Sequence, residues 1–502
     1  MTEAAVQNAT TPAAAPSSAS RNNRVAIVLL LLSTFVVFLN ETTMSVALPK
    51  IMTAFTISAS AGQWLTTAFA LTAAIVVPIT GWLLQRLNTR PVFITAMSLF
   101  TAGTLLGAVA PTFGVLLLAR VIQASGTSIM MPLLMTTVLQ LVPLADRGRM
   151  MGRISIVISV APAIGPAVSG LIVQSLPWEF VFWLVLPIAA AMLVVGIVKV
   201  PNISEPRRAP LDFLSIVLSA FAFGGLVYGL SALGSNAEGD ELVAPWMPLT
   251  AGAVFLVLFV IRQLVLQRRD AALLDLRTFR SRTFTMSIVM FIVMMVALFG
   301  TVIVLPLYAQ KVLGASTLES GLVLLPGGLI MGLIGPIVGR IFDRRGTGPL
   351  IVPGAVLVSL GFWGLTMVGA GTSVWFLLLP HIVMSIGLGM LFTTLFTVST
   401  SALPPHLYSH GSAILTTLQQ VAGAAGTALF VALLAAGTVA AGSTNPADPA
   451  PRELMQGVHW AFLFGAIVSL VPIAIGFFVR KPKAAEVTDE ELATGSVPVA
   501  HH

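Results

Sequence analysis

The chain has 502 residues, of which 57% are hydrophobic and 9% charged, and its mean hydropathy is +0.97. A soluble protein of this length carries about 25% charged residues, so the composition excludes a soluble protein and indicates one that crosses a membrane many times. The net charge of +7 does not indicate a nucleic-acid partner, because the basic residues lie in short loops between apolar runs. Without cysteine, the chain has no disulfides, thiolate nucleophiles or cysteine metal sites.

Apolar stretches long enough to cross a bilayer recur along the whole chain, since a hydrocarbon core about 30 Å thick needs about 20 apolar residues per helix. They run near 25–48, 62–84, 91–110, 113–141, 154–176, 180–199, 211–233, 246–266, 283–307, 317–341, 350–370, 374–400, 411–437 and 457–479. We therefore expect an all-α polytopic membrane protein with fourteen transmembrane helices. Residues 1–24 are polar and predict a disordered tail rather than a cleaved signal peptide. Residues 481–502 form a second polar tail.

Positive charge tests this count independently. Threading the chain through the stretches in turn places nearly all of the 26 lysine and arginine residues in loops on one side. The exceptions are Lys50, Lys311 and Arg452 on the other side, and Arg120 within a span. Because basic loops stay in the cytoplasm, we expect both termini there, with the protein in the cell membrane.

Two similar turns suggest that the chain consists of two related halves. Residues 81–86 follow the second apolar stretch and residues 339–346 follow the tenth. Related halves around a central site are a transporter design. We expect an N-terminal six-helix bundle at 25–200, a linker with two extra helices and a basic cytoplasmic loop at 201–282, and a C-terminal six-helix bundle at 283–480.

Glu41 and Arg120 are the two clear cases of a charge deep in an apolar stretch. Such a charge costs roughly 3 kcal/mol or more, so a chain that keeps it usually uses it. Burial raises the pKa of a carboxyl group and a nearby cation lowers it, which suits Glu41 to carry a proton and Arg120 to tune it. The alternatives are a glutamate locked permanently to a partner and an arginine that only ties helices together. Gln123 lies one turn after Arg120 and extends the polar patch.

The segments around Glu41 and Arg120 both resemble motifs of one protein family. Residues 39–49 read Leu-Asn-Glu-Thr-Thr-Met-Ser-Val-Ala-Leu-Pro, which resembles the pattern Leu-Asp-x-Thr-x-x-Asn-Val-Ala-Leu-Pro of the fourteen-span drug:proton antiporters in the major facilitator superfamily. Asn40 stands where that pattern has its acid, and the acid lies one position on, at Glu41. Residues 120–126 are similar to the family's Arg-x-x-Gln-Gly-x-Gly. The resemblance implies a major facilitator fold and a Gram-positive bacterial exporter of the multidrug or lincomycin-resistance type.

A third motif lies in the fifth apolar stretch. Residues 161–170 resemble the antiporter motif Gly-x-x-x-Gly-Pro-x-x-Gly-Gly, with Gly165, Pro166 and Gly170 in place. Small residues four apart let helices approach closely, and a close-packed helix beside the cavity can seal it against ion leak. The alternative is generic helix packing. We assign Asn40 and Thr42, together with Gln123 and His381, to the substrate cavity; a neutral hydrogen-bonded structural role is the alternative for His381.

The two turns resemble the family's cytoplasmic motif Gly-x-x-x-Asp-Arg-x-Gly-Arg-Arg. Gln85 replaces the acid in the first half. In the second half Gly339, Asp343, Arg344 and Gly346 fit. We therefore expect a cytoplasmic gate that depends on Asp343; a charge cluster that only sets the topology is the alternative.

These features predict a proton-coupled exporter of drugs or other amphipathic small molecules that works by alternating access. No lysine follows a glycine, so the chain has no phosphate-binding loop of the Gly-x-x-x-x-Gly-Lys type, and the energy must come from an ion gradient. We expect no cofactor and no metal, and a monomer whose partners are its substrate, protons and the bilayer. A proton-coupled transporter of one metabolite or nutrient is the alternative. A channel and a membrane-embedded enzyme are disfavoured, because the two-half plan suits neither and no cluster of His, Asp or Glu lies near one interface.

Overall fold

The computed structural model describes residues 18–203, 206, 210–234, 244–369, 371–443 and 449–479. Its helices are α1 (Ser18–Phe55), α2 (Ala59–Arg86), α3 (Thr89–Ala108), α4 (Phe113–Leu141), α5 (Arg147–Ser175), α6 (Phe180–Lys199), α7 (Phe213–Gly234), α8 (Trp246–Leu266), α9 (Arg282–Lys311), α10 (Thr317–Arg345), α11 (Gly348–Thr366), α12 (Leu378–Ser401), α13 (Tyr408–Ala440), α14 (Pro451–Val468) and α15 (Leu470–Gly476). Within the described ranges, 14 helical segments are long and apolar enough to cross a membrane, which confirms the count expected from the sequence.

Two ends differ from the expected boundaries. Residues 18–24, expected in the N-terminal tail, form the first turns of α1. The last span is divided at Ser469 into α14 and α15. The remainder of the N-terminal tail and the tail expected at 481–502 lie outside the described residues, as do parts of the expected linker.

Local signals place the ends of the helices that matter for the site. The hydroxyl groups of Ser58 and Thr112 accept hydrogen bonds from the first turns of α2 and α4. Ser316 and Glu319 form a reciprocal capping box at the start of α10. At the other end of α10, Gly346 adopts a φ of 75°, and its amide donates to the Phe342 carbonyl. A positive φ is open to glycine without strain, so this glycine ends the helix.

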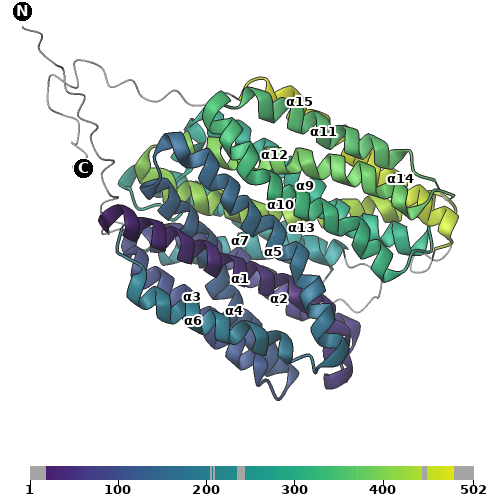
Figure 1. Cartoon of the computed structure of the whole chain (residues 1–502), viewed down its shortest axis with the longest axis horizontal. Coiled ribbons are helices and arrows are strands. Elements are labelled where there is room, and N and C mark those ends of the chain that lie inside the picture. Colours follow the sequence, from purple (N-terminus) through teal and green to yellow (C-terminus); the bar gives the residue numbers. More distant parts are fainter. Residues whose placement is uncertain are drawn as a thin grey trace, which may run out of the picture.

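The helices form two bundles of six spans, with α7 and α8 inserted between them in the sequence (Figure 1). Across the boundary between the bundles, α5 packs on α10 and α2 packs on α13. The inserted α7 packs on both α2 and α13, and α8 packs mainly on α7. Trp64 of α2 stacks on Tyr228 of α7, with ring centroids 5.8 Å apart. The inserted pair therefore contacts both bundles.

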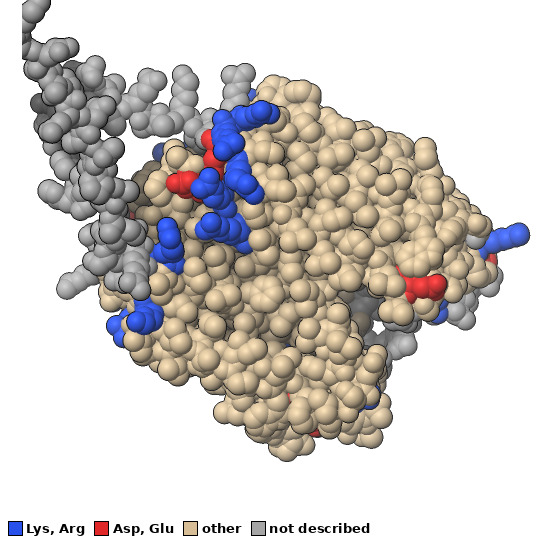
Figure 2. Space-filling view, in the orientation of Figure 1, with Lys and Arg blue, Asp and Glu red and all other residues tan. Residues whose placement is uncertain are grey.

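One end of the molecule is strongly basic. Lysine and arginine side chains gather there (Figure 2). Helices α2 and α10 end on that side, at Arg86 and Arg345, and α5 begins there, at Arg147. We name it the basic end. The surface in Figure 2 is hollowed between the two lobes at the opposite end. The bundles are thus closed together at the basic end and separate towards the other.

Candidate functional site

Glu41 lies on α1, in the half that is further from the basic end, and its side chain is partly exposed. Its carboxylate makes no hydrogen bond or salt bridge to any residue that the structure describes. It lies close enough to Arg120 for a Coulombic interaction. The neighbouring Asn40 is 1% exposed, and neither polar atom of its side chain has a partner among the described residues. The acid therefore faces accessible space, while the position of the family's usual acid is buried in packing.

Arg120 is 1% exposed and is held by groups other than Glu41. Its Nε donates to the Leu65 carbonyl at 3.4 Å, and a terminal nitrogen donates to Gln123 Oε1 at 2.6 Å. Its guanidinium lies 4.3 Å from the centre of the Phe69 ring, a cation–π contact. Gln123 in turn donates to the hydroxyl group of Thr104 at 2.9 Å. Three partners from α2 and α4 thus fix the cation, and Thr104 of α3 holds one of them, so the place of the cation does not depend on the charge state of Glu41.

The glycine motif of α5 packs against α1 beside Glu41. A Cβ atom at Gly165 would overlap the Thr42 hydroxyl and lie 2.9 Å from the Leu39 carbonyl. The hydroxyl of Ser169, a residue that replaces a motif glycine, donates to the Thr43 carbonyl at 2.7 Å. At Gly170 a Cβ atom would meet only one carbon, at 3.9 Å. Close approach is therefore required at Gly165 but not at Gly170. Pro166 lies inside the helix, which continues past it to Ser175.

His381 belongs to the other bundle. It is 5% exposed on α12, and a Cβ atom at Gly327 of α10 would overlap its ring. Its Nδ1 has no hydrogen-bond partner within the described part of the chain. Among the described residues, no hydrogen bond joins His381 to Asn40, Thr42 or Gln123, the three residues assigned to the cavity with it. It is a buried histidine against a glycine.

Closure of the basic end depends on the helix pair α5 and α10. The two carboxylate oxygens of Asp343 accept hydrogen bonds from the backbone amides of Gly148 and Arg149, both at 2.8 Å. These amides belong to the first turn of α5, where the helix dipole favours an anion. A Cβ atom at Gly148 would lie 2.6 Å from the Gly339 carbonyl. The carboxylate and the two glycines thus hold the bundles together. Arg344, expected in the same gate, is exposed.

A second contact at the basic end was not expected from the sequence. Gln85 Nε2 lies 2.6 Å from His410 Nε2 and donates to the Ser409 hydroxyl at 3.2 Å. Gln85 occupies, in the first half, the position that corresponds to Asp343 in the second. Nearby, Arg147 donates to the Tyr408 hydroxyl at 3.2 Å. The repeat of the turn motif pointed to position 85, but nothing in the sequence identified α13 as its partner.

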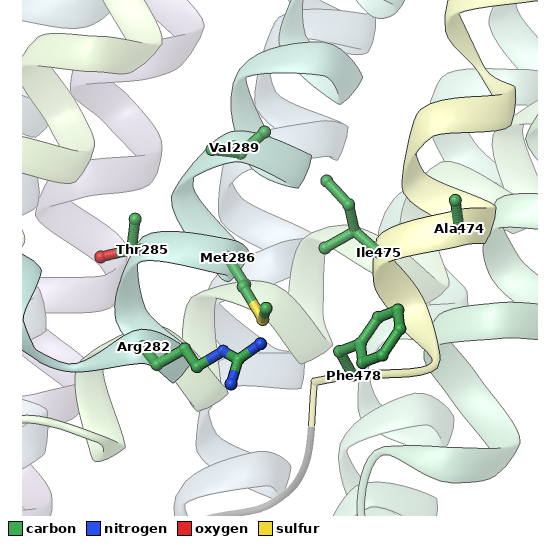
Figure 3. Close-up of a pocket in the computed structure, with 7 residues that line it drawn as sticks. All are labelled: Arg282, Thr285, Met286, Val289, Ala474, Ile475 and Phe478. Atoms are coloured by element: carbon green, nitrogen blue, oxygen red, sulfur yellow. The ribbon is translucent and has the colours of Figure 1, made fainter.

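A separate groove of about 360 Å³ lies at the basic end between α9 and α15. Figure 3 shows Arg282 below Met286, with Phe478 across the opening and Val289 and Ile475 forming apolar walls. Phe478 is among the exposed large hydrophobic residues. The groove shares no lining residue with the Glu41 site.

Comparison with known proteins places these features in a family. The sequence profile of the Major Facilitator Superfamily matches residues 30–427. The chain belongs to the major facilitator superfamily. It is 38% identical to a lincomycin resistance protein, LmrB, of Listeria innocua over 90% of this chain and 96% of that protein. It is 28% identical to a multidrug resistance protein B homolog of Mycobacterium tuberculosis over 80% of this chain and 75% of that protein.

Solved structures of the superfamily share the fold. The proton:xylose symporter XylE superposes with a TM-score of 0.61 at 16% identity, covering 92% of this chain and 96% of that one. The human organic anion transporter MFSD10 gives a TM-score of 0.62 at 16% identity, covering 90% and 99%. The major facilitator fold expected from the sequence is thereby confirmed. The chain is a multi-pass membrane transporter of small molecules rather than an enzyme.

Proposed function

We propose that the protein exports drugs or other amphipathic small molecules in exchange for protons. The names of the relatives, which refer to lincomycin and multidrug resistance, support an exported drug. We propose further that it acts as a monomer in a bacterial, Gram-positive plasma membrane. The basic end and both termini then lie in the cytoplasm, because loops rich in lysine and arginine stay on that side. No cofactor takes part, and the proton gradient supplies the energy.

The contrast between Glu41 and Arg120 carries the proposal. The carboxylate is partly exposed and makes no hydrogen bond within the described chain, whereas the guanidinium is buried and held by a carbonyl, an amide and a ring. An acid in this position can gain or lose a proton without unseating its neighbour. Its protonation removes a Coulombic attraction inside a medium of low dielectric, where that attraction is strong.

The proposed cycle begins with the bundles closed at the cytoplasmic end and open to the outside. Glu41 takes a proton there, and its attraction to Arg120 weakens. The bundles then turn to face the cytoplasm, where an entering substrate favours proton loss. The charged pair, with substrate bound, returns outward. The glycine contact at Gly165 keeps α1 and α5 packed during this change, which limits proton leak beside the acid.

Replacement of Glu41 by Gln tests the proposal, because it keeps the shape and removes the titration. In inside-out membrane vesicles with an acidic lumen, we expect wild-type protein to accumulate labelled lincomycin and the Glu41→Gln variant to accumulate none above background, at equal expression. Glu319→Gln is the matched control, since Glu319 is an exposed capping residue of α10. We expect it to behave as wild type.

Two results would contradict the proposal. Undiminished gradient-driven accumulation by Glu41→Gln would remove the acid from coupling. Accumulation of no tested drug, with exchange of one labelled metabolite, would favour a metabolite transporter. Exchange of labelled for unlabelled substrate also separates a carrier from a channel, because a channel does not show counterflow.

A further inference from the structure

The linker segment 272–275 is buried although it has no helical structure. It follows η2 (Gln267–Arg269) and precedes η3 (Leu276–Arg280), and its four residues are between 2% and 9% exposed. Leu273 and Leu274 belong to the main hydrophobic core. Connecting segments normally run over the surface, because a buried segment without regular structure must find partners for its backbone polar groups. This segment therefore needs a specific support.

That support is Gln263 of the inserted helix α8. Its side chain is fully buried, and its Oε1 accepts hydrogen bonds from the amides of Leu273 and Leu274 at 2.7 and 3.2 Å. Its Nε2 donates to the Ser215 hydroxyl of α7 at 2.8 Å. The Ser215 hydroxyl donates in turn to Asp212 at 2.6 Å. One amide side chain therefore joins both inserted helices to the buried segment.

The segment ends at the contact between the two bundles. A Cβ atom at Gly81 of α2 would lie 3.6 Å from the Leu273 carbonyl, 3.6 Å from His410 Nδ1 and 3.3 Å from the Cβ of Ala413. The first atom belongs to the linker, and the other two belong to α13. One turn along α2 from Gly81, Gln85 contacts His410. The segment is thus packed into the place where α2 meets α13.

We propose that Gln263 is a positioning residue for transport. Through it, the inserted pair α7–α8 holds the 272–275 segment in the α2–α13 contact and stabilises the state that is closed at the cytoplasmic end. The two extra helices of this fourteen-span chain then act on the gate instead of only filling space between the bundles. The inference rests on the alternating access of the proposed function, but not on proton coupling or on the identity of the substrate.

Access to a buried cysteine on α13 tests the inference. The chain has no cysteine, so a single Ser412→Cys substitution gives one label site without background. Ser412 is fully buried on α13, two positions beyond His410. Its reaction with a membrane-impermeant maleimide in inside-out vesicles reports opening of the cytoplasmic end, and needs no substrate or proton gradient. It therefore remains informative even if Glu41→Gln leaves transport intact.

We expect Gln263→Leu to raise the labelling rate roughly tenfold, because it leaves two buried amides without an acceptor. Gln267→Leu is the matched control, since Gln267 lies one turn on and its Oε1 has no hydrogen-bond partner in the described structure. It should label as wild type.

Equal labelling rates for Gln263→Leu and Gln267→Leu would overturn the inference. If Gln263→Leu does not give a monodisperse protein, Ser215→Ala supplies the test. It removes the bond that ties Gln263 to α7 together with the bond from Ser215 to Asp212, and leaves the bonds from Leu273 and Leu274 to Gln263 in place. A labelling rate equal to wild type would then count against the proposal.

Discussion

Replacement of Asp343 by Asn should open the basic end of the transporter. Each oxygen of the carboxylate accepts one backbone hydrogen bond from the first turn of α5, at Gly148 and Arg149. These bonds join α10 to α5 across the two bundles. In the proposed cycle they would break when the bundles separate at this end, so their loss should act on the equilibrium between the two states as well as on the folded structure.

The size of the effect follows from the geometry. Asn offers one acceptor oxygen, so one of the two amides loses its partner and faces an NH₂ group instead. A hydrogen bond to a charged group contributes about 1.5–3 kcal/mol, and an anion at a helix N-terminus adds about 0.3–1 kcal/mol. Because the site is partly exposed, we take about 2 kcal/mol, which corresponds to a roughly 30-fold change in the ratio of open to closed molecules.

Distance measurement between two spin labels checks this prediction. Leu87 at the end of α2 and Gly348 at the start of α11 are exposed and belong to different bundles, and the absence of native cysteine makes the labelling specific. A side chain at Gly348 would meet no atom within 4 Å. We expect Asp343→Asn to shift the distances measured at the basic end to larger values.

The matched control is Asp146→Asn. Asp146 precedes the same helix and is 57% exposed, and its salt bridge to Arg149 at 3.7 Å stays within one bundle. It changes the net charge equally and should leave the distances unchanged. If the two variants gave the same distance distribution, Asp343 would be no more than a topogenic charge.

Three further outcomes follow from single contacts. Arg120→Lys should lower drug efflux about tenfold at equal expression, because lysine lacks the fork that reaches both Leu65 and Gln123; unchanged efflux in a susceptibility assay with and without protonophore would refute this. Gly126→Ala should destabilise the protein by about 1–3 kcal/mol, because its Cβ would lie 2.6 Å from the Phe100 amide, whereas Gly114→Ala meets nothing within 4 Å and should melt as wild type in detergent. Hydrogen bonds from Arg262 lower the pKa of Asp212 to about 2, so the ion pair adds stability above about pH 4 that is lost as the pH falls through about 2. The melting temperature of Asp212→Asn should therefore lie below that of wild type by a constant amount from pH 7 to pH 5. A difference in melting temperature that widens below pH 4 would contradict this prediction.

The spans could be read from the sequence because each depends on a local property, an apolar run of sufficient length. Glu41 and Arg120 were recognisable for the same reason, since a charge inside such a run is visible without any structure. The partners of Arg120 were not, apart from Gln123 one turn away. Leu65 and Phe69 lie on another helix, and no local pattern pairs them with the arginine.

The contacts at the basic end show the same limit. No local pattern pairs His410 with its contact Gln85, which lies 325 positions away. The burial of the linker, by contrast, is indicated by its own sequence. Four apolar residues at 271–274 stand in a loop otherwise rich in arginine and aspartate. An apolar run too short to span a membrane, inside a basic loop, has to be buried against something else.

The two sides of the closed end differ in chemistry, and this difference explains why the linker is placed where it is. On the α5–α10 side, an anion accepts two amide hydrogen bonds. On the α2–α13 side, the side-chain amide of Gln85 contacts the Ser409 hydroxyl and a ring nitrogen of His410, and no carboxylate takes part in these contacts. A neutral hydrogen bond contributes about 0.5–1.5 kcal/mol, about half of what a charged one contributes. The side without the carboxylate is therefore the weaker one, and it is there that the segment held by Gln263 is packed between the bundles. A carboxylate restored by Gln85→Glu should reduce the dependence of closure on Gln263, so the labelling difference between Gln263→Leu and wild type should shrink in that background.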